Sequence, residues 1–136
     1  MNYREIRNES EAKRTILLNE SGLFFAFNNE QFIEGIEKNK HHLKDGFKFV
    51  SIGAGGYLPK NNVDKFLDGL EAIRKAEKKA IKAEKDAKEA HILFELCNHE
   101  AFYTCSIEDA MRVLPYTPKQ VWDVYNKHKE AYQANL

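Results

Sequence analysis

The run Gly53-Ala54-Gly55-Gly56 follows an alternating apolar stretch and is the first candidate for binding chemistry. Glycine loops bind phosphates when they lead straight into a helix or end in Gly-Lys-Ser/Thr, because backbone N–H groups must point at the anion. Here five residues, including Pro59, separate the run from the next expected helix. A hairpin turn is therefore favoured, and a nucleotide-binding loop completed by Lys60 stays open as an alternative.

A second candidate is a metal site. His91, Glu95 and His99 are spaced four residues apart and would share one face of a helix, with Cys97 and Cys105 close by in sequence. Zinc or iron could use such ligands. The spacing matches neither a Cys-x-x-Cys pair nor a His-Glu-x-x-His motif, so we favour structural roles and predict no metal and no cofactor.

Nucleophilic catalysis is the third candidate, with Cys97, Cys105 or Ser51 as the nucleophile. Each would need a base within hydrogen-bond reach and a group that orients the base. The chain contains histidines but no recognisable local arrangement of this kind. We therefore predict that the protein is not an enzyme.

The composition is that of a globular chain. It has 136 residues, 43% of them hydrophobic, and 21 basic side chains balance 21 acidic ones. This length suits a single domain over residues 1–136. No run approaches the ~18 apolar residues that span a membrane, and the charged N-terminus lacks a signal core. With only two cysteines, we expect a cytoplasmic protein, and the zero net charge argues against general affinity for nucleic acid.

The first half of the chain combines helical and strand patterns. A polar helix is expected over residues 1–20 and could fray, and the apolar run 23–27 is either a strand or the approach to a helix. A short helix follows at 29–39. Alternating aromatic and β-branched residues at 47–52 predict a strand, with a return strand at Tyr57-Leu58.

The pattern from residue 62 to about 100 predicts one long helix, capped by Asn61 or Asn62. It would be roughly 55–60 Å long at 1.5 Å per residue, so it would project, pair with another chain, or break near Lys85-Asp86. We favour a continuous helix. Its centre, residues 74–90, is rich in Ala, Lys and Glu. Small side chains would let a partner or a second copy approach closely at Ala76, Ala80 and Ala87.

Residues 106–133 predict a pair of helices, at 107–114 and 118–133, joined by a tight turn. Thr117-Pro118-Lys119-Gln120 is a strong helix start signal. The pair is similar to a helix-turn-helix or ubiquitin-associated-type unit, and the lysines of its last helix could contact DNA. Asp123 and Glu130 interrupt that face, so packing is favoured over DNA binding.

Four stretches of this chain resemble one known family. They are Phe24-Phe25-Ala26-Phe27-Asn28-Asn29-Glu30-Gln31-Phe32, Val50-Ser51-Ile52-Gly53-Ala54-Gly55-Gly56-Tyr57, Glu95-Leu96-Cys97-Asn98-His99-Glu100-Ala101-Phe102-Tyr103-Thr104 and Tyr116-Thr117-Pro118-Lys119-Gln120-Val121. The family consists of small uncharacterised proteins of bacteriophages and gut-bacterial mobile elements. Some relatives are suspected anti-CRISPR or anti-defence inhibitors, which implies a host protein or ribonucleoprotein as partner.

Together these patterns predict an α+β fold with a small antiparallel β element, a long central helix and a C-terminal helical pair. The predicted function is non-catalytic binding that inhibits or adapts a host macromolecule, in the cytoplasm of a bacterial host and without a membrane contact. The alternatives are a DNA-binding regulator and a nucleotide-binding sponge, and a homo-oligomer could form through the long helix. The residues predicted to contact the partner are Tyr57, Lys60, Asn61, Asn62, Ala76, Ala80 and Ala87.

Overall fold

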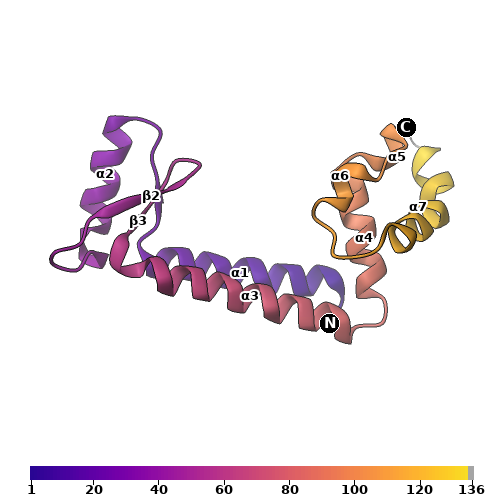
Figure 1. Cartoon of the computed structure of the whole chain (residues 1–136), viewed down its shortest axis with the longest axis horizontal. Coiled ribbons are helices and arrows are strands. Elements are labelled where there is room, and N and C mark those ends of the chain that lie inside the picture. Colours follow the sequence, from indigo (N-terminus) through magenta and orange to yellow (C-terminus); the bar gives the residue numbers. More distant parts are fainter. Residues whose placement is uncertain (135–136) are drawn as a thin grey trace. The chain divides into compact units, whose positions relative to one another are not determined.

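The computed structural model describes residues 1–134, which form an α+β fold with a small three-stranded antiparallel sheet (Figure 1). The predicted fold class is confirmed. The chain divides into two compact units. The hairpin unit is Ile6–Lys79, and the C-terminal unit combines Met1–Glu5 with the chain from Ala80 onward. The single domain over residues 1–136 stays a prediction.

Two antiparallel helices, α1 (Tyr3–Ser21) and α3 (Val63–Ala83), run side by side in the hairpin unit (Figure 1). Leu17 packs directly on Gly69, where a Cβ would lie only 2.7 Å from the leucine side chain. Further contacts along the pair are the hydrogen bond from Asn62 to the Ser21 carbonyl and the ion pair between Arg14 and Glu77. The first helix, expected to fray because its composition is polar, is thus held by packing against α3.

The sheet has the strand order β1-β3-β2, with antiparallel pairing throughout. The predicted strand at 47–52 and its return at Tyr57-Leu58 are confirmed, and the run 23–27 contributes a short strand. The helix α2 (Asn29–Asn39) has the predicted bounds. The remaining elements here are β1 (Phe24–Phe25), β2 (Phe49–Gly53), β3 (Gly56–Pro59) and the 3-10 turns η1 (Lys40–His42) and η2 (Lys60–Asn62).

Four aromatic rings join the sheet to α2. Phe24, at the centre of the cluster, lies 5.5 Å from Phe49 and 5.6 Å from Tyr57 between ring centroids, and Tyr57 in turn lies 4.8 Å from Phe32. The buried Gly35 of α2 makes room for this cluster, because a Cβ there would stand 2.2 Å from the Phe24 ring. Residues far apart in sequence thus build this part of the core.

The prediction of one helix from 62 to 100 is wrong. α3 ends at Ala83, and α4 (Ala87–Asn98) begins after a break at 84–86. The Ala- and Lys-rich segment favours helix locally but has little to bury, so tertiary contacts decide its path. At the break, the amino group of Met1 donates to Glu84 at 2.9 Å, and beyond it Ile92 enters a different core from that of α3.

The C-terminal unit is helical. Three helices follow α4: α5 (Ala101–Thr104), α6 (Glu108–Met111) and α7 (Pro118–Gln133). The predicted helix at 118–133 and its start are confirmed, since Thr117 and Gln120 form a capping box. The residues buried in the shared core are Ile92, Leu96, Ala101, Phe102, Ile107, Ala110, Leu114, Val121 and Tyr125.

The predicted helix at 107–114 is shorter than expected and ends at Met111. Pro115 prevents the helix from continuing past Leu114, because a proline disfavours helical backbone in the residue before it, and residues 112–113 form turns instead. Leu114 is buried in the core instead, with its backbone N–H bonded to Ala110.

Over residues 1–134 no helix combines the length and apolarity needed to cross a membrane.

Candidate functional site

The glycine run forms the turn of the β2–β3 hairpin. Ala54 and Gly55 have φ of 52° and 79°, and positive φ at both central residues is the signature of a type I′ hairpin turn. The Gly55 carbonyl accepts a hydrogen bond from Ala26 at 2.9 Å. The hairpin prediction is therefore confirmed, and the run leads into β3 rather than into a helix.

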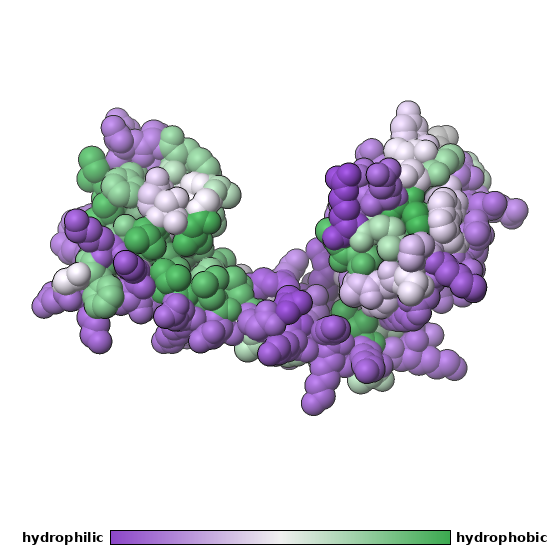
Figure 2. All heavy atoms as spheres, viewed as in Figure 1, coloured by the Kyte–Doolittle hydropathy of each residue, from purple (hydrophilic) through white to green (hydrophobic). Residues whose placement is uncertain are grey.

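Large apolar side chains are exposed around this turn. Phe25, Phe27 and Ile52 have exposures of 55%, 75% and 44%. Phe25 pairs with Gly56, and Ile52 packs over the same glycine. The Phe27 ring covers Gly55, where a Cβ would meet it at 2.3 Å. We call Phe25, Phe27 and Ile52 the apolar tip, and apolar side chains gather around the sheet in Figure 2.

The predicted contact residues Asn61 and Asn62 serve the fold. The Asn61 side chain accepts from the Lys44 backbone N–H at 3.2 Å and donates to the His42 carbonyl at 3.1 Å. Asn62 donates to the Ser21 carbonyl at 3.0 Å. The sequence predicted that one of them caps α3, but both side-chain oxygens have other partners. Asn61 Oδ1 accepts from the Lys44 backbone, and Asn62 Oδ1 accepts from Asn61 Nδ2 at 3.2 Å.

Tyr57 and Lys60 occupy different environments. Tyr57 is half-buried, and its ring stacks on Phe24 and meets Phe32 edge-on. Lys60 is exposed, and its backbone N–H donates to the Lys48 carbonyl at 2.9 Å. Of the residues predicted between 57 and 62, Lys60 has the side chain most available to a partner.

The predicted alanine stripe is not continuous. Ala76 is exposed and Ala80 half-buried on α3, whereas Ala87 lies beyond the helix break and is 2% exposed. Ala87 therefore belongs to the interior, and a partner cannot reach all three alanines along one helix face. The break at 84–86 is the reason.

Lysines occupy the exposed face of α3. At about 100° per residue they fall within one arc, opposite the buried Phe66 and Ile73. No ion pair joins any of them to another described residue, whereas the neighbouring Glu71 is paired with Arg74 at 2.6 Å. Two such faces would repel each other, which disfavours self-association face to face. The lysines are Lys75, Lys78, Lys79 and Lys82.

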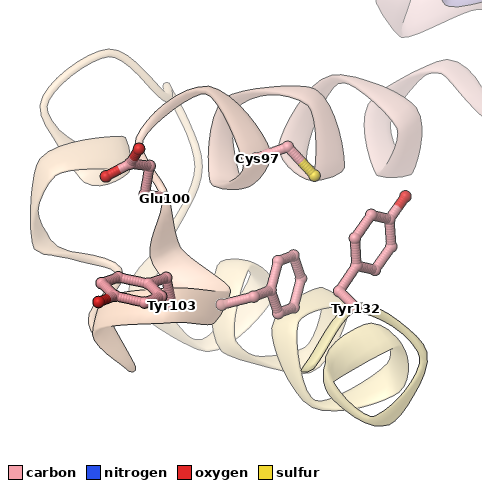
Figure 3. A pocket seen from close by; sticks show the side chains of 5 residues that line it. Cys97, Glu100, Tyr103 and Tyr132 are labelled. Atoms are coloured by element: carbon pink, nitrogen blue, oxygen red, sulfur yellow. The ribbon is translucent and has the colours of Figure 1, made fainter. Parts of the chain in front are cut away.

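A cavity of about 330 Å³ lies in the C-terminal unit (Figure 3). Its lining residues are Cys97, Glu100, Phe102, Tyr103 and Tyr132. Burial raises the pKa of the Cys97 thiol, and a hydrogen bond with Tyr132 only partly opposes this. A nucleophilic cysteine needs a lowered pKa, so the surroundings of Cys97 disfavour its thiolate form.

His91 of α4 and His99, the C-cap of α4, have interaction partners other than the cysteines. His91 Nδ1 lies 2.9 Å from the Tyr116 hydroxyl, and its ring stacks on Tyr3 at 5.0 Å. His99 Nε2 instead approaches Glu95 at 3.3 Å. Within residues 1–134, no three His, Cys, Asp or Glu side chains are grouped closely enough to hold a metal ion.

The C-terminal helical pair is poorly suited to DNA binding. α6 is a single turn, and two lysines of α7 are already engaged by carboxylates. Lys119 lies 3.1 Å from Asp123, and Lys127 lies 2.8 Å from Glu89. These pairs reduce the positive charge that the last helix presents.

Residues 3–134 match the model of a family described as "Family of unknown function (DUF7659)". The chain belongs to this family. No curated protein and no solved structure matches it. The DUF7659 match covers both units, so the apolar tip and the cavity both lie in its matched region.

Neither the apolar tip nor the cavity of this DUF7659 chain was predicted from the sequence. A signal for the tip was present, because Phe25 and Phe27 alternate with the buried Ala26. Most of the cavity lining lies within residues 97–103, but the cavity is completed by Tyr132 of α7, which the local sequence does not bring to this position. The tip presents exposed apolar side chains, and the cavity is a hollow lined by aromatic and polar side chains.

Proposed function

We propose that the chain is a non-catalytic binding protein whose apolar tip docks on a partner protein. The observation that carries the proposal is the exposure of Phe25, Phe27 and Ile52 together around one turn. Exposed apolar groups that lie together mark interaction sites, and aromatic residues are enriched at the centres of protein interfaces. The glycines of the turn contribute no side chains, so a partner could reach the rings directly.

The partner in this proposal is a host protein or ribonucleoprotein in the bacterial cytoplasm. Support comes from the resemblance to small proteins of phages and mobile elements. Two of the stretches that carry it, 24–32 and 50–57, contain the residues of the apolar tip. Inhibition of a CRISPR nuclease or another defence enzyme is the most specific form of the proposal.

The test is affinity capture from host lysate, with mass spectrometry of what is retained. The bait proteins are the wild type, the tip variant Phe25→Ser/Phe27→Ser, and the control Ile33→Ser. Ile33 is matched because it is also exposed and apolar but lies on α2. Loss of a central hot-spot residue weakens binding by about tenfold or more.

We expect the wild type and the control to retain the same partner and the tip variant to lose it. Circular dichroism must show that all three proteins are folded. Equal retention by the folded tip variant would contradict the proposal and move the search to other surfaces.

A second candidate function is contact with nucleic acid, favoured by the lysines on the exposed face of α3. Such binding would weaken as the salt concentration rises. On duplex DNA, the logarithm of the association constant falls against the logarithm of the salt concentration with a slope of about −0.9 for each phosphate contacted. Salt-insensitive or absent DNA binding would remove this candidate.

A nucleotide sponge has less support, because Phe27 covers Gly55 of the turn. Nucleotide carried through purification would restore it.

A further inference from the structure

The sheet of the hairpin unit has an open edge along β2. In the strand order β1-β3-β2, β3 has a neighbour on each side, whereas β2 pairs only with β3. Lys60 donates its backbone N–H to the Lys48 carbonyl at 2.9 Å, so these two residues form a hydrogen-bonded pair of the antiparallel ladder. Such pairs alternate along the ladder with pairs that exchange no hydrogen bonds.

This alternation directs the backbone N–H and C=O groups of Phe49 and Ser51 away from β3. Phe49 stands opposite Pro59, which has no N–H to donate, and Ser51 stands opposite Tyr57. Tyr57 in turn pairs on its other side with Phe24 of β1. Within residues 1–134, no hydrogen bond outside the sheet engages the backbone of Phe49 or Ser51. Backbone groups in this arrangement match the backbone of another extended strand.

The two ends of this edge differ in chemistry. At the turn end lies Ile52 of the apolar tip, where a bulge ends the regular pairing. At the other end, Lys48 and Lys60 are exposed and lie directly opposite each other, an arrangement in which like charges repel. Lys40 of η1 is paired with Glu37 at 2.6 Å, but neither Lys48 nor Lys60 forms an ion pair within residues 1–134. The edge is thus apolar at one end and basic at the other.

We propose that β2 accepts an extended segment of the partner protein as an added antiparallel strand. The segment has an apolar residue at its amino end, beside Ile52, and carboxylates at its carboxyl end, beside Lys48 and Lys60. The inference rests on the proposed function, because the partner that contacts the apolar tip supplies this strand. In such complexes main-chain hydrogen bonds give affinity and side chains give specificity. Antiparallel pairing is chosen because it is slightly more stable per residue than parallel pairing.

A second copy of this chain fits the edge less well than a partner segment of this kind. Residues 46–63, which contain β2, β3 and their turn, include no Asp or Glu. Edge-to-edge pairing of two β2 strands would therefore bring no carboxylate of the hairpin to Lys48 and Lys60. Charge complementarity favours an acidic segment from another protein.

The first experiment is an NMR titration of the full chain with an end-blocked synthetic octapeptide. The peptide has two leucines at its amino end, alternating threonine and valine in its middle, and two aspartates at its carboxyl end. One control peptide is N-methylated at the backbone nitrogens of its middle residues and cannot donate to the edge. A second control has asparagines in place of the aspartates.

We expect saturable shifts at the amides of Phe49 and Ser51. The N-methylated peptide should bind about tenfold more weakly, because hydrogen bonds to the edge are lost, and the asparagine peptide about two- to fivefold more weakly at low salt. Equal binding of the N-methylated peptide, or no shifts at Phe49 and Ser51 with millimolar peptide, would overturn the proposal.

The second experiment closes the edge from the side of the protein. Ser51→Pro removes an outward N–H and leaves the ladder to β3 intact, since proline is tolerated on edge strands. It also removes the hydroxyl that accepts from the Gly53 N–H at 3.3 Å, so the matched control is Ser51→Ala, which lacks the hydroxyl but keeps the N–H. We expect Ser51→Pro to bind the octapeptide about three- to tenfold more weakly than Ser51→Ala. If circular dichroism shows that Ser51→Pro is unfolded, the N-methylated peptide decides.

Capture from host lysate with the same two variants separates this inference from the proposed function. We expect Ser51→Ala to retain the partner that the wild type retains, and Ser51→Pro to lose most of it. If the tip variant Phe25→Ser/Phe27→Ser loses the partner but folded Ser51→Pro retains it, strand addition is refuted and docking through the tip stands. If both retain it, the proposed function itself fails. Dimerisation of the wild type in sedimentation that Ser51→Pro abolishes would assign the edge to a second copy and also overturn the inference.

Discussion

The two units build their cores from different ranges of the sequence. In the C-terminal unit, the shared core from Ile92 to Tyr125 comes from helices that follow one another along the chain. In the hairpin unit, the aromatic cluster joins Phe24 to Phe49 and Tyr57 across intervening elements. Contacts between residues that are close in sequence cost less loop-closure entropy. The C-terminal core therefore depends on helix packing, and the hairpin core on long-range positioning of a few rings.

The largest effect is expected from Leu96→Ala in the C-terminal core. Leu96 is fully buried, and truncating a buried leucine costs about 2–5 kcal/mol through lost transfer energy and a cavity. Urea unfolding measures the loss. Trp122 is the only tryptophan and reports on this unit, so fluorescence and circular dichroism together show whether both units unfold at once.

Leu67→Ala is the control for this truncation, because Leu67 is exposed on α3 and should change stability by about 0.5 kcal/mol or less. If Leu96→Ala lowers the free energy of unfolding by less than about 1 kcal/mol, the C-terminal core can close over the space left by the truncated side chain. The helical core of the C-terminal unit would then not be tightly packed, in contrast to what the comparison with the aromatic core of the hairpin unit assumes.

An intermediate effect is expected from Gly35→Ala in the hairpin unit. The new Cβ would stand 2.2 Å from the Phe24 ring, which Phe49 and Tyr57 hold in place. Overpacking costs about 1–3 kcal/mol, and the better helix propensity of alanine offsets up to about 1 kcal/mol. We expect a net loss of about 1–2 kcal/mol in thermal or urea unfolding.

Glu34→Ala, the exposed neighbour on α2, is the matched control and should stay within about 0.5 kcal/mol of the wild type. If Gly35→Ala proves as stable as the wild type, the rings of the hairpin unit can rearrange freely. The fixed positions of Phe24, Phe49 and Tyr57 would then not be what stabilises the hairpin unit.

The smallest effect concerns charge at the surface of the C-terminal unit. Hydrogen bonds from Lys127 and His128 lower the pKa of Glu89 below its usual value of 4.5. A carboxyl with a lowered folded-state pKa stabilises above its unfolded pKa, and this stability is lost as the pH falls through the folded value. The stabilisation from Glu89 should therefore be present at pH 6 and disappear on acidification below about pH 4.5.

Unfolding of the wild type and Glu89→Gln at pH 6 and at pH 3 measures this contribution. Because Glu89 is partly exposed, the difference at pH 6 should be only about a few tenths of a kcal/mol, and it should shrink at pH 3. A difference that is the same at both pH values would show that Glu89 acts by packing rather than by charge.

Local sequence determined the strands, several helices and the hairpin turn. Alternation at 47–52, the glycine run before Tyr57, and the capping box at Thr117 each act within a few residues. Backbone preference and side-chain periodicity over such short distances are set by neighbours along the chain. These elements could therefore be predicted without knowing what they pack against.

Tertiary structure decided where the long helical pattern breaks and which surfaces a partner can reach. Residues 74–90 favour helix throughout, yet the chain turns at 84–86 because Ile92 and Leu96 pack into a core of their own. The cavity beside Glu100 likewise exists only because α4, α5 and α7 pack against one another. Helix propensity is summed locally, whereas burial depends on distant residues, and burial determined both outcomes.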